Sequence, residues 1–280
     1  MKFLSQCRHA VAIAAVAAGA LLPTQATAQA GPTGPAPGPW RYGATIYGYL
    51  PTIGGTTTFP ADASGTGINV SGDQIIDGLK FAFMGSFDAH NGRWGVFTDV
   101  MYLDIGGSKS NSRDFSIGSI GIPAGTSADL DLDLKGWVWT LAGEYRVMSS
   151  PAATMDVLAG ARMFDLKERL NWSIYGNLGP IAAPGRNGSS EISDTVWDAI
   201  IGVKGRYAFG PNREWLVPYY LDVGTGESKL TWQGAIGLGY AFKWGDVVAM
   251  WRYLGYEFKS GSRVEDMNFN GPMIGATFRW

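Results

Sequence analysis

Residues 271–280, GPMIGATFRW, decide the fold class of this chain. Alternate side chains of an extended strand share a face. One face of this stretch carries Ile274, Ala276, Phe278 and Trp280, and the other carries Met273, Gly275, Thr277 and Arg279. The alternation predicts a strand with one apolar face. In a soluble sheet such an edge invites mispairing, whereas a closed membrane barrel exposes this face to lipid and holds its aromatic side chains at headgroup level.

The composition favours a β-rich protein over a helical membrane protein. The chain has 280 residues, of which 40 are glycine and only 16% are charged, and its mean hydropathy is near zero. Abundant glycine with few charges suits strands joined by tight turns. The net charge of −2 provides no electrostatic attraction for nucleic acid, so we expect no nucleic-acid partner.

Residues 1–28 are typical of a secretory signal peptide. Lys2 and Arg8 form its positive start, residues 10–22 form its apolar core, and Ala-Thr-Ala at 26–28 predicts cleavage near Ala28. The alternative is a membrane anchor, but the apolar core is shorter than the roughly 20 residues that span a bilayer. Residues 29–39 are rich in Pro and Gly and predict an extended linker, and residues 40–280 are expected to form the barrel.

From residue 40 onward the chain divides into ten strand-sized segments whose connections alternate between short and long. Their approximate ranges are 41–59, 79–89, 94–105, 129–146, 155–172, 191–209, 215–223, 230–242, 247–258 and 266–280. Asn91-Gly92 is a strong hairpin signal, and Ser71 with Gln74 predicts a helical turn at 73–77. The apolar alternation changes phase near Lys135-Gly136, which predicts a bulge.

These features predict an all-β fold: a closed, antiparallel, up-and-down transmembrane barrel of about ten strands, with eight or twelve as alternatives. On nearly every segment one face is bulky and apolar, and the other carries Gly, Ala and isolated charges. A soluble lipocalin-like barrel is the alternative, but its outward face would be rich in Lys and Glu. Short turns on one side and long loops on the other are typical of transmembrane barrels.

The chain resembles the small outer-membrane β-barrel proteins of Gram-negative bacteria, in particular the OmpA-like transmembrane barrel group. The resemblance covers about residues 40–280 and rests on WGVFTDVMYLDIGG at 94–107, WRYLGYEF at 251–258 and the ending GP-x-x-GATFRW. It implies an outer-membrane location among lipid and lipopolysaccharide, and recognition of Phe278 and Trp280 by the barrel-assembly machinery. We expect no soluble peptidoglycan-binding domain after the barrel. The resemblance leaves the oligomeric state open.

The sequence contains only weak candidates for catalytic, metal or cofactor sites. Cleavage of the signal removes Cys7, the only cysteine, so the mature chain has no thiol nucleophile or thiolate site. His90, then the only histidine, is expected to be a solvated turn residue. Asp129, Asp131 and Asp133 lack the Gly and the distal Glu of a calcium loop. We therefore expect no enzymatic activity, no metal and no cofactor.

Charged residues on the inward faces are the candidate functional set. They are Arg41, Lys80, Asp88, Asp99, Glu144, Arg146, Asp156, Arg162, Asp198, Lys204, Arg206, Asp222 and Arg252. Isolated buried charges are very costly, so these groups are expected to pair and to plug the lumen. The alternative is a narrow water-filled path whose charges set selectivity.

The predicted function is accordingly a structural or surface-interaction role in the outer membrane. A narrow porin-like channel for small solutes is the alternative, and a ligand binder using the lumen or loops is a third possibility.

Deletion of residues 278–280 should impair barrel assembly more than deletion of residues 31–39. The closing strand loses its terminal aromatic side chains in the first variant, whereas the second shortens only a linker. The folded fraction in membranes, measured by gel mobility with and without boiling, checks this. Equal membrane yields for the two deletions would contradict it.

Overall fold

The computed structural model describes residues 37–57, 66–112, 116–117, 120–121, 126–178, 181–182, 186–262 and 264–280. The predicted signal peptide, its cleavage site and most of the linker lie outside the described residues. The elements are β1 (Arg41–Tyr49), β2 (Thr52–Thr57), β3 (Thr66–Val70), α1 (Gly72–Gly78), β4 (Leu79–His90), β5 (Trp94–Ser112), β6 (Ser116–Ile117), β7 (Ile120–Gly121), β8 (Thr126–Ser149), β9 (Ala153–Leu178), β10 (Ile181–Ala182), β11 (Arg186–Phe209), β12 (Trp215–Gly226), β13 (Leu230–Ala241), β14 (Gly245–Glu257) and β15 (Val264–Arg279). Among the described residues, no helix has the length and apolar character needed to cross a bilayer.

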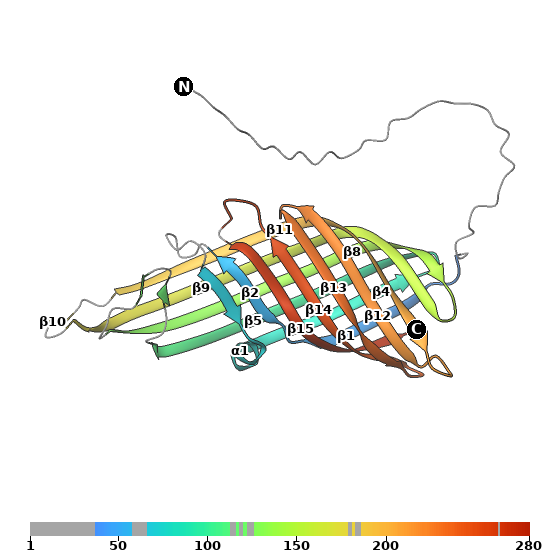
Figure 1. The fold of residues 1–280 in the computed structure, drawn as a ribbon, viewed down its shortest axis with the longest axis horizontal. Coiled ribbons are helices and arrows are strands. Elements are labelled where there is room, and N and C mark those ends of the chain that lie inside the picture. Colours follow the sequence, from blue (N-terminus) through green and yellow to red (C-terminus); the bar gives the residue numbers. More distant parts are fainter. Residues whose placement is uncertain are drawn as a thin grey trace, which may run out of the picture. The chain divides into compact units, whose positions relative to one another are not determined.

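Ten antiparallel strands form a closed barrel, as the sequence predicted (Figure 1). Their order is β1, β4, β5, β8, β9, β11, β12, β13, β14 and β15. The last strand pairs with the first, from Gly43 opposite Arg279 to Tyr49 opposite Met273. Two further backbone bonds join Tyr42 to Trp280, at 2.9 and 3.1 Å. The predicted closure of the barrel is confirmed, with residues 271–280 in the strand that closes it.

The short turns and the two chain ends of the barrel lie together. Hairpins join β4 to β5, β8 to β9, β11 to β12 and β13 to β14 at this end, which we call the turn end. The Asn91-Gly92 hairpin is confirmed: Gly92 has a φ of 90°, and the Asn91 N–H donates to the Trp94 carbonyl at 2.9 Å. The longer connections lie at the opposite end, which we call the loop end.

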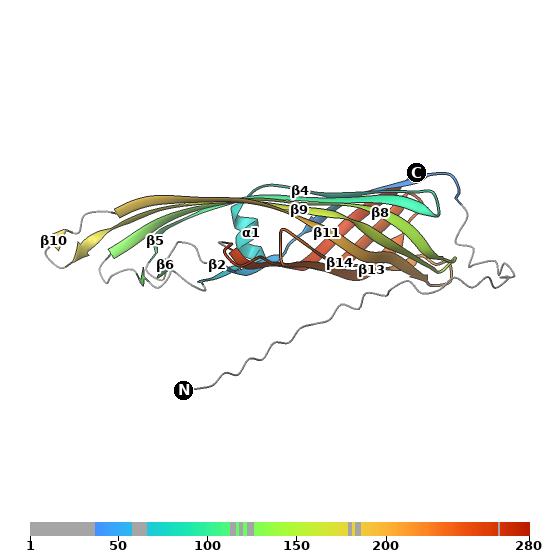
Figure 2. The ribbon, with the colours of Figure 1, turned by 90° about the horizontal axis from the view of Figure 1, so that it is seen from above.

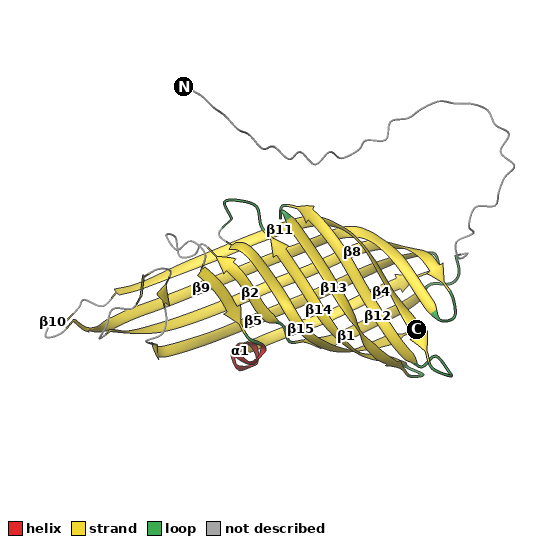
Figure 3. Ribbon diagram, in the orientation of Figure 1, coloured by secondary structure: helices red, strands yellow, loops and turns green. Residues whose placement is uncertain are grey.

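The first predicted strand is broken, because Leu50-Pro51 separates β1 from β2. β1 pairs with the turn-end half of β15, and β2 pairs with its loop-end half and with β3. The predicted helical turn at 73–77 is confirmed as α1, and Figure 3 shows it as the only helix among the described residues. Figure 2 shows α1 between the two walls of the barrel. The β1–β4 ladder ends at Ile46 and Gly85. Beyond this point, α1 connects β3 to β4.

The outer surface of the barrel is a lipid-facing apolar band between two aromatic girdles. Its middle exposes large aliphatic side chains such as Ile46 (67%), Ile201 (64%) and Ile274 (62%). The turn-end girdle contains Tyr42, Phe87, Trp94, Tyr145, Tyr207, Phe209, Trp215, Tyr240, Phe242, Trp244, Phe278 and Trp280. The outer girdle, toward the loop end, contains Phe81, Tyr102, Trp137, Trp139, Trp197, Trp232 and Tyr253. The stretch from Trp197 to Tyr207 matches the roughly 9–11 residues of a transmembrane strand. A closed antiparallel barrel with an apolar band between two aromatic girdles is the architecture of transmembrane β-barrels.

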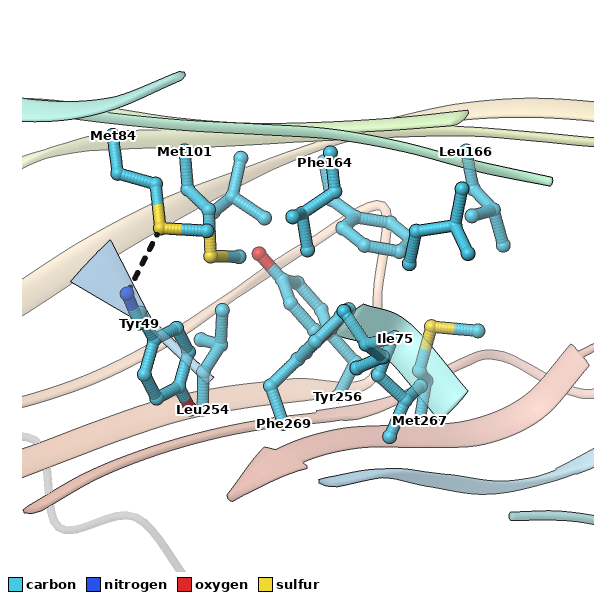
Figure 4. Close-up of a cluster of buried hydrophobic side chains, with 14 of the residues drawn as sticks. Tyr49, Ile75, Met84, Met101, Phe164, Leu166, Leu254, Tyr256, Met267 and Phe269 are labelled. Atoms are coloured by element: carbon cyan, nitrogen blue, oxygen red, sulfur yellow. Dashed lines mark hydrogen bonds between the residues drawn. The ribbon is translucent and has the colours of Figure 1, made fainter. Parts of the chain in front are cut away.

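The loop-end half of the lumen is filled by a hydrophobic core (Figure 4). Its members include Ile53, Ile75, Leu103, Ile105, Val138, Phe164, Leu166, Leu254, Tyr256, Met267 and Phe269, all buried. Phe164 packs against Tyr256 with ring centroids 4.7 Å apart. Ile75 brings α1 into this core and is 1% exposed. The sequence pattern predicts small and charged residues throughout the interior, and this prediction is wrong for the loop-end half.

The predicted bulge at Lys135-Gly136 is wrong. The ladders of β8 with β5 and β9 run through this site without a register shift. Leu134 therefore faces inward like Val138 and packs against the hydrophobic core. The apparent change of phase has a different cause: the lumen changes from a polar to an apolar lining along β8. The irregularity in this strand lies near the turn end instead, between Arg146 and Met148.

Candidate functional site

Arg252 on β14 organises a polar layer across the middle of the lumen. Its guanidinium donates to the Tyr47 hydroxyl at 2.9 Å, to both Asp99 oxygens at 3.3 Å and to Gln233 Oε1 at 3.0 Å. Tyr47 in turn donates to Asp99 at 2.6 Å. The Tyr49 ring lies 5.5 Å from the guanidinium carbon, within cation–π range. Since strands β1, β5, β13 and β14 all contribute, this cluster ties opposite walls of the barrel together.

A second buried pair, Arg162 with Asp222, lies beside this layer. Arg162 is 0% exposed and Asp222 is 2% exposed. The guanidinium makes a bidentate contact with the carboxylate, one arm of which measures 2.9 Å. Arg162 also donates to Thr140 Oγ1 at 3.1 Å and to Thr231 Oγ1 at 3.4 Å. Because these four residues come from β8, β9, β12 and β13, this contact also spans the lumen.

Lys204 on β11 joins two carboxylates near the turn end. Its ammonium lies 2.6 Å from Glu144 Oε1 and is also paired with Asp88. It lies 4.1 Å from the centroid of the Phe97 ring. Glu144 is 2% exposed, and Lys204 is the cation that offsets its burial. The contact crosses from β11 to β4 and β8, which lie on other parts of the wall.

Arg146, Asp156 and His90 form a neighbouring cluster. Arg146 binds both oxygens of Asp156, at 2.7 and 2.8 Å, and His90 Nε2 lies 3.4 Å from the same carboxylate. His90 was expected to be a solvated turn residue, but it is 5% exposed. Gly95 on β5 makes room for it, because a Cβ there would collide with the His90 ring and approach Glu144 Oε2.

His90, Glu144 and Asp156 place their ligand atoms within 4.8 Å of one another, as a metal site requires. The protein's own groups already contact each of these three residues. The Gly92 N–H donates to His90 Nδ1 at 2.7 Å, so the neutral ring carries its proton on Nε2, the atom that would have to bind the metal. Arg146 and Lys204 neutralise the two carboxylates. The arrangement is that of an ion-pair cluster.

These clusters line a vestibule at the turn end. The cavity has a volume of about 410 Å³ and is lined by Asp88, His90, Asp156 and Lys204, among others. Its mouth carries Arg41, Arg206 and Arg279, and Asp246 pairs with Arg279 there. Toward the loop end, Tyr47 and Asp99 of the Arg252 layer form its floor. Beyond that floor lies the hydrophobic core, with a cavity of only about 20 Å³.

The structure brings most of the predicted charged residues together, but not all of them. Asp198 is buried and accepts hydrogen bonds from Ser228 N and Oγ at 2.9 and 2.7 Å, which holds a loop-end turn. Arg41 is exposed at the vestibule mouth. Arg206 lies 3.9 Å from Asp246 at the same mouth.

Lys80 was predicted to face the lumen, and this is wrong. It lies on the outer surface of the barrel, where its ammonium pairs with Asp133. A register shift between Leu79 and Phe81 changes the direction of its side chain. The hydrogen bond from Lys80 lowers the pKa of the Asp133 carboxyl below its ordinary value.

Several residues that line the lumen are absent from the set predicted from the sequence. Tyr47, Thr140, Thr231 and Gln233 contribute hydrogen bonds to the two buried arginines. All four have the parity of inward-facing positions, which is the signal in the sequence that identifies them. Asp246 lies just before the predicted strand at 247–258, in the predicted turn. It shares the parity of Arg252 on β14, so the same alternation identifies it as inward-facing.

Arg162→Met should lower the free energy of unfolding by about 3–5 kcal/mol, because it leaves the Asp222 carboxylate buried without a cation. Adding Asp222→Leu should recover most of this loss. Urea unfolding in lipid vesicles measures both. The exposed pair Lys229–Glu257 is the matched control, with an expected coupling of about 0–1 kcal/mol. Equal coupling free energies for the two pairs would contradict the assignment of Arg162–Asp222 as a buried pair that stabilises the barrel.

Comparisons with known proteins find no match in sequence and only distant likenesses in structure. No protein-family model matches the chain, and no curated protein matches it. Among solved structures, it is similar to Ail, the attachment invasion locus protein of Yersinia pestis, crystallised with the heparin analogue sucrose octasulfate (13% identity, TM-score 0.34, 86% of this chain and 98% of that one). It is also similar to the translocator domain of autotransporter NalP from Neisseria meningitidis (12%, 0.34, 85% and 88%) and to the Ralstonia pickettii toluene transporter TbuX (8%, 0.24, 87% and 90%). At these identities and scores the likenesses carry no argument about activity.

Proposed function

We propose that this chain is an integral outer-membrane barrel with a closed lumen and a structural or surface-interaction role. One observation carries the proposal: successive layers fill the interior from wall to wall. The Arg252 layer and the Arg162–Asp222 pair block the middle, and the hydrophobic core fills the loop-end half. A water-filled path through buried ion pairs and packed aromatic rings would have to break both.

The loop end supports the surface-interaction part of the proposal. Strands β5, β8, β9 and β11 have 19, 24, 26 and 24 residues, whereas β12 and β13 have 12 each. The long strands continue as one ladder well past the other strands (Figures 1 and 2). A transmembrane strand needs about 9–11 residues, so roughly half of each long strand lies beyond the membrane. The extension would present a broad sheet to the cell's surroundings.

The turn end supports the proposed assembly route and orientation. Trp280 is 65% exposed on the lipid-facing side and stacks with Tyr42, so its ring and that of Phe278 are accessible to the barrel-assembly machinery during folding. Short turns face the periplasm in transmembrane barrels, so the loop end faces outward in this proposal. Export with cleavage near Ala28 completes the route.

A narrow channel is the alternative function. The observation that favours it is the 410 Å³ vestibule, a polar cavity that opens at the turn end. Its floor of Tyr47, Asp99 and Arg252 would then have to move to admit a solute.

Purified protein in planar lipid bilayers should show no steady openings, because the buried arginine pairs and the hydrophobic core fill the lumen. Single-channel current recording makes this measurement. An open porin reconstituted in the same bilayers is the positive control and should show steady stepwise openings. Steady stepwise openings of the unaltered protein would refute the closed lumen and favour the channel.

A further inference from the structure

Three lysines gather on the outward face just past the outer girdle. On β8, Lys135 lies two residues from Trp137 in the direction of the loop end, on the same face of the strand. It lies directly opposite Lys167 on β9. The side chain of Lys135 is 50% exposed, and Lys167 is also exposed. Lys80 of β4 approaches this face with a side chain that is 52% exposed. The three ammonium groups therefore lie on neighbouring parts of one wall, above the aromatic rings of Tyr102 and Trp137.

A glycine on the intervening strand makes this gathering possible. Gly106 of β5 lies between Lys80 and Asp133, and a Cβ at that position would collide with the Lys80 side chain. Without that obstacle, Lys80 crosses β5 to pair with Asp133. Asp104 similarly holds Lys135, with an N–O distance of 2.9 Å. Two of the three ammonium groups are thus fixed in position by carboxylates.

Lys167 differs from the other two lysines. Among the side chains that the structure describes, no carboxylate lies within ion-pair distance of its ammonium, and its cross-strand neighbour is Lys135. Like charges directly opposite each other destabilise a sheet. An anion bound between Lys135 and Lys167 would remove this repulsion, and ammonium groups form strong charge-assisted hydrogen bonds with phosphate.

The position of the lysines identifies the kind of anion. They lie at the boundary between the apolar band and water, the level that lipid headgroups occupy. The outward surface below them is continuous with Tyr102 and Trp137, which can pack against acyl chains. We propose that Lys80, Lys135 and Lys167 form a binding site for a phosphorylated lipid headgroup of the outer leaflet. The proposal rests on the orientation proposed above, with the loop end outward.

Binding of diphosphoryl lipid A to the full-length barrel in neutral detergent, followed by native mass spectrometry, tests this site. The unaltered protein should retain the lipid. Lys135→Gln with Lys167→Gln should weaken binding about tenfold or more, since the loss of about 1.4 kcal/mol corresponds to a tenfold change. Lipid A without its phosphates should bind the unaltered protein as weakly as the intact lipid binds the variant. Inorganic phosphate at equal concentration should not displace the lipid.

The control variant carries Lys243→Gln and Arg213→Gln, which remove two exposed charges at the turn end. It should bind like the unaltered protein. Equal binding by the Lys135/Lys167 variant, an equal loss in the control, equal binding of the dephosphorylated lipid, or displacement by inorganic phosphate would each overturn the proposal. Gel mobility with and without boiling verifies that each variant is folded. Steady conductance would refute the closed lumen but leave these lipid results unchanged, so the two failures are distinguishable.

Discussion

The ladder between β1 and β15 is the interaction on which the rest of the structure depends. In hydrocarbon an unpaired backbone group costs several kcal/mol, so a sheet can cross a membrane only if it closes. Seven residue pairs, from Gly43–Arg279 to Tyr49–Met273, achieve this closure. Closure then fixes a narrow interior and an outer surface that must be apolar. Where β1 leaves the sheet at Leu50-Pro51, β2 continues the pairing with β15, and α1 bridges the remaining distance to β4.

Two different solutions fill that narrow interior. The hydrophobic core excludes water from the loop-end half, which makes any charge there very costly. Apart from Asp198, which holds a loop-end turn, the buried charged groups discussed above lie in the middle and at the turn end. There, Arg162, Lys204 and Arg252 each have a carboxylate partner from another strand. These partners tie the walls together across the lumen. The barrel thus resembles a folded core more than a pore, and its function is proposed to lie on its surfaces.

Most of the fold could be predicted from the sequence, because strand periodicity and turn residues are local signals. The ten barrel strands, the Asn91-Gly92 hairpin, α1 and the closing strand are examples. What could not be predicted depends on contacts between distant strands. The alternation pattern predicts an outward-facing Leu134, because it assumes that the lumen is not apolar. It predicts an inward-facing Lys80, because the register shift on β4 leaves no mark in the sequence of that strand. The burial of His90 depends on Gly95 of the neighbouring strand β5, because a side chain there would collide with the His90 ring.

Thiol accessibility along the lumen tests the closed interior most directly, because the mature chain predicted here has no cysteine of its own. Ser86→Cys lines the vestibule, and Val138→Cys lies in the hydrophobic core. A membrane-impermeant thiol reagent should modify the first rapidly in folded barrels and the second no faster than the barrel unfolds. Rapid modification of both cysteines in the folded protein would show a water-filled lumen and contradict the account.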